Sequence, residues 1–399
     1  MATTSILPFT LGQAILGQAT EPEPEPGLHP PVFDQPREWA TPRVILQSLP
    51  SGKILDWSVP LMGADVTRVL TGPGALSGSL PEGYQFPVQE WGSALWVESD
   101  GMFHGGGVVT TVEHSDRVIR VSCTGVSGYP QGMPWLAPRE DLINVDPLDI
   151  VRMIWGHLQD SPDGDLGVDV DGLSSPVRVG EEERDVEFTT GDGSDVAFET
   201  GPFRLNPIDT QDLAKTIEDL AGDTPFDFAE ESRWVGESIR HRIRLGYPSL
   251  GVTRSDFVLD TRVNTSVLPA LGFDGEDYAS EVLLIGAGEG RDAITAHVPS
   301  RGGRLRRVAI VADKSVRSQK TAARVAREEL AARTAEGAIS NLVVVDSPAA
   351  PLDVLNLGDT IPVVGPLATG AYLDHMVRVI EITRPLDDFS TAALTVVNV

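Results

Sequence analysis

A glycine-rich segment that follows an apolar run has the composition of a nucleotide-binding loop. Residues Gly286 to Arg291 read Gly-Ala-Gly-Glu-Gly-Arg after the apolar run 282–285. A dinucleotide fingerprint needs a third glycine where this chain has Arg291, and it needs a following helix whose N-terminus binds the phosphate. Residues 293–298 alternate as a strand instead. The segment therefore predicts a hairpin turn between two strands.

Four aspartates in one short segment resemble the ligands of a calcium loop. They are Asp163, Asp165, Asp169 and Asp171. Carboxylate oxygens are the ligands that Ca²⁺ prefers, but an EF-hand loop also needs a bidentate Glu at its last position, where this sequence has Ser174. We therefore predict a solvated acidic loop over residues 163–171, with a weak, adventitious calcium site as the alternative.

The other groups that could catalyse a reaction are scattered along the chain. The seven histidines form no HExxH motif, and no GxSxG nucleophile elbow occurs. A pair of carboxylates for glycoside hydrolysis leaves no sequence signature, because its spacing is spatial. The sequence therefore predicts no catalytic, cofactor-binding or metal-binding residue and no cofactor, and we expect a protein that is not an enzyme.

The composition is that of an acidic globular protein. The 399 residues include 31 Lys and Arg against 58 Asp and Glu, which gives a net charge of −27. Such a surface repels the phosphates of nucleic acids and of anionic membranes. No apolar run approaches the length of a membrane span. The single cysteine, Cys123, excludes a disulfide framework and a cysteine zinc site, and its alternating neighbours predict a buried side chain.

The first two of four predicted parts are an arm and a β module. Residues 1–40 contain the alternating Glu-Pro run 21–26, which is extended and self-repelling. This arm is either a disordered tail or a strap that orders on a neighbouring subunit, with Phe33 and Trp39 as anchors. Residues 41–140 hold short alternating runs between Gly and Pro turns, and they predict a first β-barrel module.

The other two parts are an insertion and a second β module. Residues 141–336 predict an inserted α+β region, which opens on a helix capped by Asp146 and closes with a long helix over residues 315–336. Residues 337–399 predict a second β-barrel module, with the turn Leu357-Gly358-Asp359 before one of its strands. The expected fold class is α+β and rich in strands, with two barrels flanking the insertion.

Three stretches of this chain resemble the tail hub, or baseplate hub, family of bacteriophage tails. They are Trp91 to Gly125, Asp146 to Asp160 and Val282 to Val399. The segment Asp146-Pro147-Leu148-Asp149-Ile150-Val151 and the turn Leu357-Gly358-Asp359 carry the resemblance most directly. Within the family, the chain looks most like the minor tail proteins of siphophages that infect actinobacteria.

The resemblance implies an architecture and a set of partners. Hubs of this family are homotrimers with two similar β-barrels per chain, and the barrels form a pseudo-sixfold ring at the distal end of the tail tube. Such a ring joins the tube to the tip and lets DNA pass without tight binding, which an acidic surface permits. The implied partners are the distal tail protein, the tape measure protein and tip or receptor-binding proteins. The implied location is the tail tip of the virion, after synthesis in the host cytoplasm.

Two other functions compete with a structural hub at this level. A tail-tip protein that binds host-wall carbohydrate would stack sugars on exposed tryptophans. The candidates are Trp91, Trp96, Trp135 and Trp234. Trp91 and Trp96 lie in a predicted strand, which favours core packing for both. A hydrolase of the host wall is the other alternative.

Overall fold

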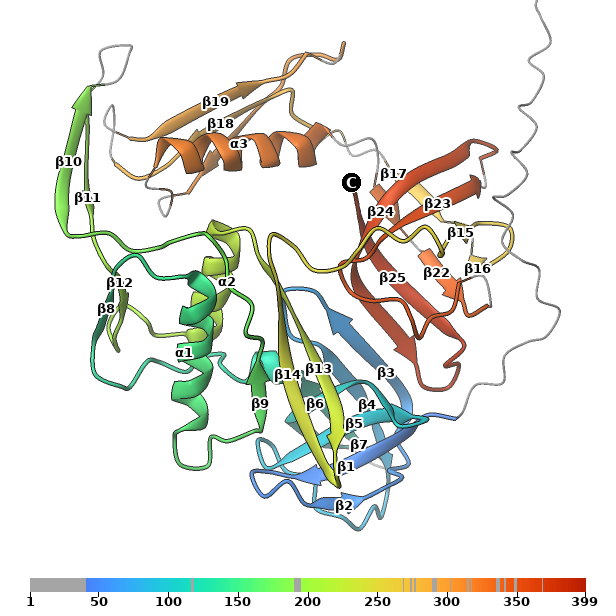
Figure 1. The fold of residues 1–399 in the computed structure, drawn as a ribbon. Coiled ribbons are helices and arrows are strands. Elements are labelled where there is room, and N and C mark those ends of the chain that lie inside the picture. The colour runs from blue at the N-terminus through green and yellow to red at the C-terminus, as the bar shows by residue number, and fades with distance from the viewer. Residues whose placement is uncertain are drawn as a thin grey trace, which may run out of the picture.

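The structure is a computed structural model, and strands dominate it (Figure 1). It describes residues 41–399 except residues 116–117, 190–194, 268, 273–274, 276–277, 289–292, 302, 314–315, 317, 335–337, 341, 348–349 and 368. The predicted arm, residues 1–40, lies outside the described residues. In the described part no helix is long and apolar enough to span a membrane.

The first β module is an antiparallel sheet in the order β3-β4-β7-β6-β5-β1-β2. Its strands are β1 (Arg43–Ser48), β2 (Ile54–Asp56), β3 (Met62–Val69), β4 (Ala75–Pro81), β5 (Ser93–Ser99), β6 (Met102–Ser115) and β7 (Val118–Thr124). Side chains alternate between its faces, and Leu46, Leu76 and Leu95 lie in the core. Cys123 is buried there as predicted, and burial raises the pKa of its thiol to about 12.

The second β module contains strands from two separate parts of the chain. They are β15 (Leu259–Asp260), β16 (Thr265–Val267), β22 (Leu342–Val345), β23 (Thr360–Pro366), β24 (Tyr372–Pro385) and β25 (Thr391–Asn398). The core of the module holds Ile361, Val363 and Val377, at every second position of their strands. β15 and β16 belong to the segment that the sequence assigned to the insertion. They pair with β23 and β22, so this sheet begins well before residue 337.

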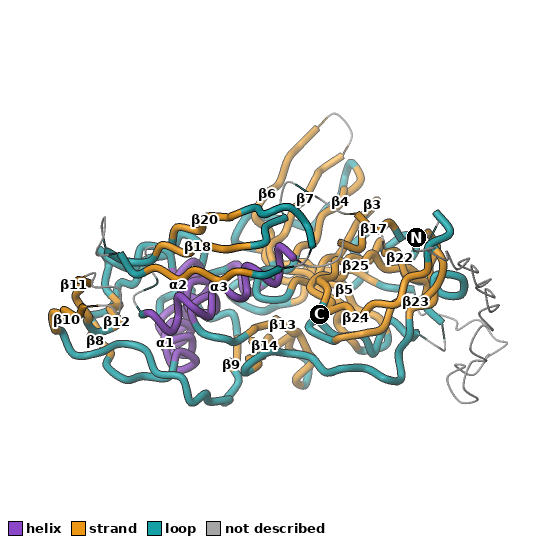
Figure 2. Tube along the Cα trace, turned by 90° about the horizontal axis from the view of Figure 1, so that it is seen from above, coloured by secondary structure: helices purple, strands orange, loops and turns teal. Residues whose placement is uncertain are grey.

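The two modules lie side by side because β3 pairs with β24 (Figures 1 and 2). The antiparallel ladder runs from Val69 opposite Glu381 to Asp65 opposite Pro385. Across it, the hydroxyl groups of Thr67 and Thr383 lie 2.9 Å apart. The ladder makes one continuous sheet of 13 strands from the two modules. We refer to this β3–β24 ladder as the seam.

The first half of the insertion packs against the first module. Its elements are β8 (Glu140–Leu142), α1 (Pro147–Gln159), β9 (Val168–Val170), β10 (Arg184–Thr189), β11 (Asp195–Thr200), β12 (Phe203–Leu205), α2 (Leu213–Asp223), β13 (Asp227–Val235) and β14 (Ser238–Gly246). The predicted cap of α1 is confirmed, because the Asp146 carboxylate accepts a hydrogen bond of 3.0 Å from the Leu148 N–H. Figure 2 shows α1 and α2 at the end of the molecule opposite β23 and β24.

The second half of the insertion is a small sheet with one helix on it. Its elements are β18 (Glu281–Ile285), β19 (Thr295–Pro299), β20 (Val308–Ala312) and α3 (Gln319–Thr334). The flanking strands β17 (Ala270–Gly272) and β21 (Ala338–Ser340) pair with each other, and Ile339 of β21 lies in the core of the second module. β18 pairs antiparallel with β19, so the glycine-rich segment after β18 joins two strands, as predicted. Residues 289–292 of that segment lie outside the described residues. α3 falls within the predicted helix 315–336 and packs Ala322, Ala326 and Leu330 on this sheet.

The hairpin β13–β14 covers the first module through a buried stack of two rings. The ring centroids of Trp96 and His241 lie 4.5 Å apart, and His241 Nδ1 lies 2.9 Å from the Ser232 hydroxyl. Both rings are buried, in a core shared with Ile154 and Trp155 of α1. Burial, with a smaller contribution from Arg240, lowers the pKa of His241 to about 4. His241 is therefore a neutral packing residue at physiological pH.

We predict that this buried imidazole makes the protein sensitive to acid. Because the folded-state pKa of His241 lies below the usual 6.5, the unfolded chain binds the proton more readily. The neutral His241 side chain makes its full contribution to the free energy of unfolding above about pH 6.5. Roughly 2 kcal/mol of that contribution is lost by pH 5. His241→Gln should flatten the loss of unfolding free energy between pH 7 and pH 5 in urea titrations. The exposed control His114→Gln should leave the wild-type slope unchanged, and equal slopes for all three proteins would contradict the prediction.

Candidate functional site

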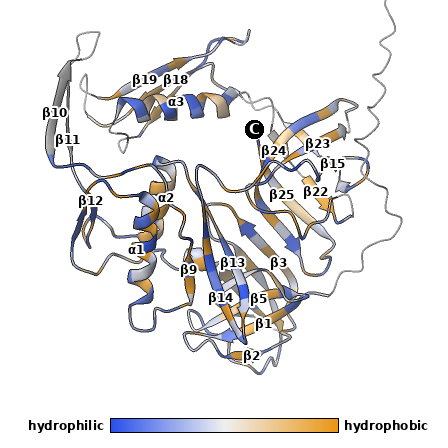
Figure 3. Cartoon of the chain, viewed as in Figure 1, coloured by the Kyte–Doolittle hydropathy of each residue, from blue (hydrophilic) through white to orange (hydrophobic). Residues whose placement is uncertain are grey.

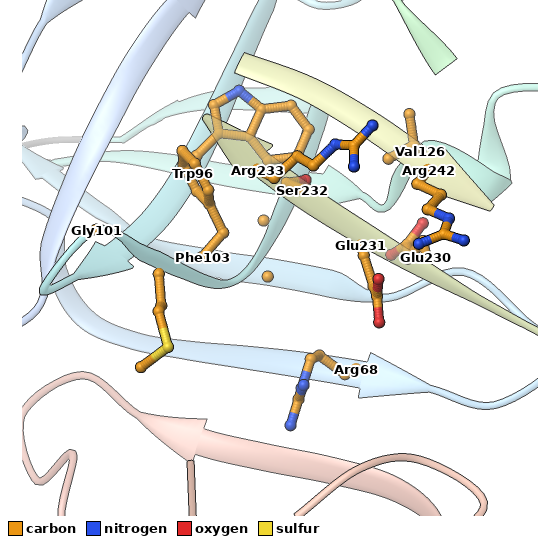
Figure 4. Close-up of a pocket in the computed structure, with 13 residues that line it drawn as sticks. Arg68, Trp96, Gly101, Phe103, Val126, Glu230, Glu231, Ser232, Arg233 and Arg242 are labelled. Atoms are coloured by element: carbon orange, nitrogen blue, oxygen red, sulfur yellow. The ribbon is translucent and has the colours of Figure 1, made fainter. Parts of the chain in front are cut away.

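A cleft of about 290 Å³ opens where the hairpin β13–β14 crosses the first module (Figure 4). Its walls come from four parts of the chain: β3, the β5–β6 hairpin, Val126 after β7, and the β13–β14 hairpin. Gly105 and Gly106 allow the close approach of β6, because both have φ near +130° and a Cβ on either would collide with neighbouring atoms. The cleft combines an apolar side, with Phe103 and Met102, and a charged side.

Glu230 binds the backbone of the first module rather than facing a substrate. Its two carboxylate oxygens accept hydrogen bonds from the N–H groups of Gly74, at 2.9 Å, and Ser127, at 2.7 Å. A Cβ on Gly74 or Gly125 would collide with this carboxylate, so glycine is required at both positions. Desolvation raises the pKa of Glu230, while the hydrogen bonds from Ser127 and Gly74 oppose that rise. The role of this carboxylate is to fix the hairpin.

The other charged residues of the cleft contact partners within the chain. Arg242 binds Asp171, and Arg233 lies 3.5 Å from Asp169. Glu231 accepts a hydrogen bond of 2.8 Å from Arg244. The Arg68 guanidinium lies 3.3 Å from the Leu355 carbonyl oxygen of the second module, and burial lowers its pKa. The charged side of the cleft thus holds elements together.

Two serine–histidine pairs are the arrangements closest to a catalytic group. His241 lies beside Ser232, and His104 Nε2 lies 2.8 Å from the Ser99 hydroxyl. Burial holds the pKa of His104 at about 3, with Arg384 and Arg68 adding to the shift. A general base works best with a pKa near the operating pH, so both imidazoles are poor bases. Their geometry suits packing.

The predicted acidic loop does not gather its carboxylates. The Asp165 carboxylate accepts a hydrogen bond of 2.7 Å from the Gly167 N–H, while Asp169 and Asp171 pair with arginines of the hairpin. In the part of the chain that the structure describes, no three His, Cys, Asp or Glu side chains are grouped as metal ligands. The alternative of a weak calcium site over residues 163–171 therefore gains no support from the geometry.

The tryptophans proposed as sugar platforms have different surroundings. Trp96 is buried, as its strand pattern predicted, and its indole N–H donates to Gln47 Oε1 at 2.8 Å. Trp135 is also buried, and its indole donates to the Pro138 carbonyl. Trp234 packs against Trp57 and Phe103. Trp91 is 50% exposed, with φ of 58°, so core packing was the wrong prediction for it.

The turn that the sequence analysis singled out forms the junction between the insertion and the second module. Asp359 is buried, and its carboxylate accepts hydrogen bonds of 3.0 Å from the Val252 N–H and 3.1 Å from the Asn356 N–H. Gly358 and Gly251 pass so close that a Cβ on either would meet the backbone of the other segment. Both glycines have φ near +85°. The Leu357-Gly358-Asp359 motif therefore has a structural role.

Arg378 of β24 links this junction to the β13–β14 hairpin. Arg378 binds the Asp227 carboxylate at the start of β13, and it donates to the Leu250 carbonyl oxygen at 3.0 Å and the Gly358 carbonyl oxygen at 3.2 Å. The same carboxylate accepts a hydrogen bond of 2.8 Å from the Leu250 N–H. No sequence pattern indicated Arg378, because two of its partners, Asp227 and Leu250, are separated from it by more than a hundred residues.

Three solved structures are similar to this fold. The 43 kDa tail protein of prophage MuSo2 from Shewanella oneidensis matches with a TM-score of 0.57 and 16% identity, over 89% of this chain and 98% of that one. The tail protein from Neisseria meningitidis gives 0.56 and 12% identity, over 89% and 96%. The prophage tail protein gp18 from Listeria monocytogenes gives 0.52 and 11% identity, over 89% and 94%.

The chain has the fold of phage tail proteins. No family model and no curated protein matches its sequence. The resemblance to phage tails is thus confirmed at the level of the fold, while the closer resemblance to proteins of actinobacterial siphophages stays a prediction.

Within this tail-protein fold, we predict that removing the Glu230 carboxylate loosens the hairpin. Glu230→Ala leaves two backbone N–H groups without acceptors, and we expect a loss of about 2–4 kcal/mol in the free energy of unfolding. The control Glu237→Ala removes an exposed carboxylate in the turn between β13 and β14 and should cost about 0.5 kcal/mol or less. Urea titration measures both. Equal losses would show that Glu230 is an ordinary surface residue.

A second prediction concerns the close approach at the junction. Gly358→Ala introduces a Cβ that collides with the Leu250 carbonyl group. Gly370 is a matched control, since it has nearly the same φ, 82° against 84°, and open space around its Cβ position. Gly370→Ala should cost about 1 kcal/mol, the penalty of a left-handed backbone alone. Gly358→Ala should lower the melting temperature clearly more, and equal shifts would contradict the collision.

Proposed function

We propose that this protein is a structural hub of a phage tail, located at the distal end of the tail tube in the virion. The observation that carries the proposal is the seam, which places two β modules side by side in a fold shared with phage tail proteins over 89% of the chain. A chain with two neighbouring modules can present two similar units to a tube of sixfold symmetry. Three copies would then complete the ring.

We also propose a more detailed architecture for this hub. Each module is taken to be one β-barrel, and the homotrimer forms a pseudo-sixfold ring that joins the tube to the tip and lets DNA pass. The division of the chain is an arm over residues 1–40, a first barrel over 41–140, an insertion over 141–336 and a second barrel over 337–399. The pairing of β15 and β16 with β23 and β22 adds residues 259–267 to the second barrel.

The negative net charge of the chain is suited to a channel through which DNA passes. A net charge of −27 per copy opposes lasting contacts with DNA phosphates, so DNA would slide past without tight binding. The proposed partners are the distal tail protein, the tape measure protein and tip or receptor-binding proteins. Wall binding is the weaker alternative because, of the four candidate tryptophans, Trp96 and Trp135 are buried and Trp91 alone is half exposed. Wall hydrolysis has no suitable base in the two serine–histidine pairs.

The test of the proposal is the mass and symmetry of the purified full-length chain. Light scattering coupled to gel filtration should give a particle of three times the chain mass of 42.7 kDa. Electron microscopy of the same fraction should show a ring with a central opening. A monomer that stays a monomer at micromolar concentration, or a closed particle without an opening, would refute the hub.

A further inference from the structure

The sheet of β18, β19 and β20 has one face that the described residues leave uncovered. α3 lies along the other face, where Val282, Leu284 and Ala296 point (Figure 1). Strand alternation places the intervening residues on the open face. It has three cross-strand rows: Leu283 between Ile310 and His297, Ile285 between Ala312 and Thr295, and Glu281 between Val308 and Pro299. The face is therefore largely apolar, and Figure 3 shows hydrophobic residues along β18 and β19.

This apolar face ends in an unpaired strand edge. β20 pairs with β18, and in the described part of the chain no strand pairs with its other side. Ile310 is 66% exposed at the middle of β20, and Val308 is also exposed. Soluble proteins rarely leave such an apolar face and strand edge bare, because both invite pairing with another chain. The sheet thus has the geometry to accept an additional extended segment.

Positive charge borders the start of β20 in an otherwise acidic protein. Arg304, Arg306 and Arg307 precede the strand, and Leu305 among them is 89% exposed. Arg306 binds both carboxylate oxygens of Glu281, at 2.7 and 2.9 Å, so the acidic residue of the face is neutralised. The positive charges of Arg304 and Arg307 therefore favour an acidic segment as the binding partner of this edge.

The N-terminal arm of this chain has the chemistry of such an occupant. Residues 1–40 contain five carboxylates against one arginine, together with apolar side chains such as Phe33. In an extended chain the N–H groups of every second residue point to the same edge. In the run 21–26 the three glutamates therefore present their N–H groups to one edge, while the three prolines, which have none, occupy the other. Such a run can add to one strand edge and then blocks further pairing.

We propose that the arm, residues 1–40, docks on the open face of this sheet, with its Glu-Pro run paired along the free edge of β20. Forty extended residues span up to roughly 130 Å, so the arm can reach this face from the start of β1 in its own copy or in a neighbouring one. The apolar side chains of the arm cover Leu283 and Ile310, and its carboxylates lie against the arginines before β20. The proposal does not depend on the function proposed above.

Disulfide trapping in the full-length chain tests this docking. The only native cysteine, Cys123, is buried, so introduced cysteines report on their own. Gly27→Cys follows the Glu-Pro run without changing charge, and Leu305→Cys lies among the arginines. Mild oxidation of the double variant, or of the two single variants mixed, should give a cross-linked band. The control pairs Gly27→Cys with Ile208→Cys, a side chain that is 80% exposed on another part of the surface.

A charge exchange shows whether the recognition is electrostatic. Arg304→Glu with Arg307→Glu should reduce the cross-link to the level of the control pair. Adding Glu21→Lys, Glu23→Lys and Glu25→Lys should restore the cross-link. This restoration also shows that the variants fold. Equal cross-linking at Leu305→Cys and Ile208→Cys, or none at either, would overturn the proposal. So would a cross-link that the charge reversal leaves unchanged.

Discussion

The ladder between β3 and β24 is the contact on which the rest of the structure depends. Its strands are separated by about three hundred residues, so closing that loop in an unstructured chain would cost about 5 kcal/mol of entropy. The insertion reduces this cost, because its own cores fold the intervening chain into compact pieces. Pairing of β3 with β24 therefore depends on the folded insertion, which brings the two strands close together.

The strand β13 is the element that contacts both modules. Asp227 and Glu230 are an odd number of residues apart, so their side chains leave opposite faces of the strand. Glu230 binds the backbone of the first module, and Asp227 binds Arg378 of the second. One strand thus contacts both modules through two carboxylates. Their acidity is useful because a carboxylate accepts several hydrogen bonds from fixed N–H groups at once.

Local patterns allowed part of this structure to be predicted from the sequence. The cap at Asp146, the hairpin after β18 and the burial of Trp96 each follow from residues close together in the chain. The contacts at Glu230 and Arg378 were not predicted, because their partners come from distant loops and leave no periodic signal. β15 and β16 were missed for another reason: strands of two and three residues are too short to show alternation.

The low identity to the three solved tail proteins agrees with a fold that depends on few particular residues. At 11–16% identity the fold persists over 89% of the chain, since a sheet core requires apolar side chains of suitable volume rather than particular residues. The positions that tolerate little change are the glycines at close approaches, such as Gly125 and Gly358, where any Cβ collides. Such positions let the hairpin and the insertion approach the two modules closely, so what they contribute is the absence of a side chain.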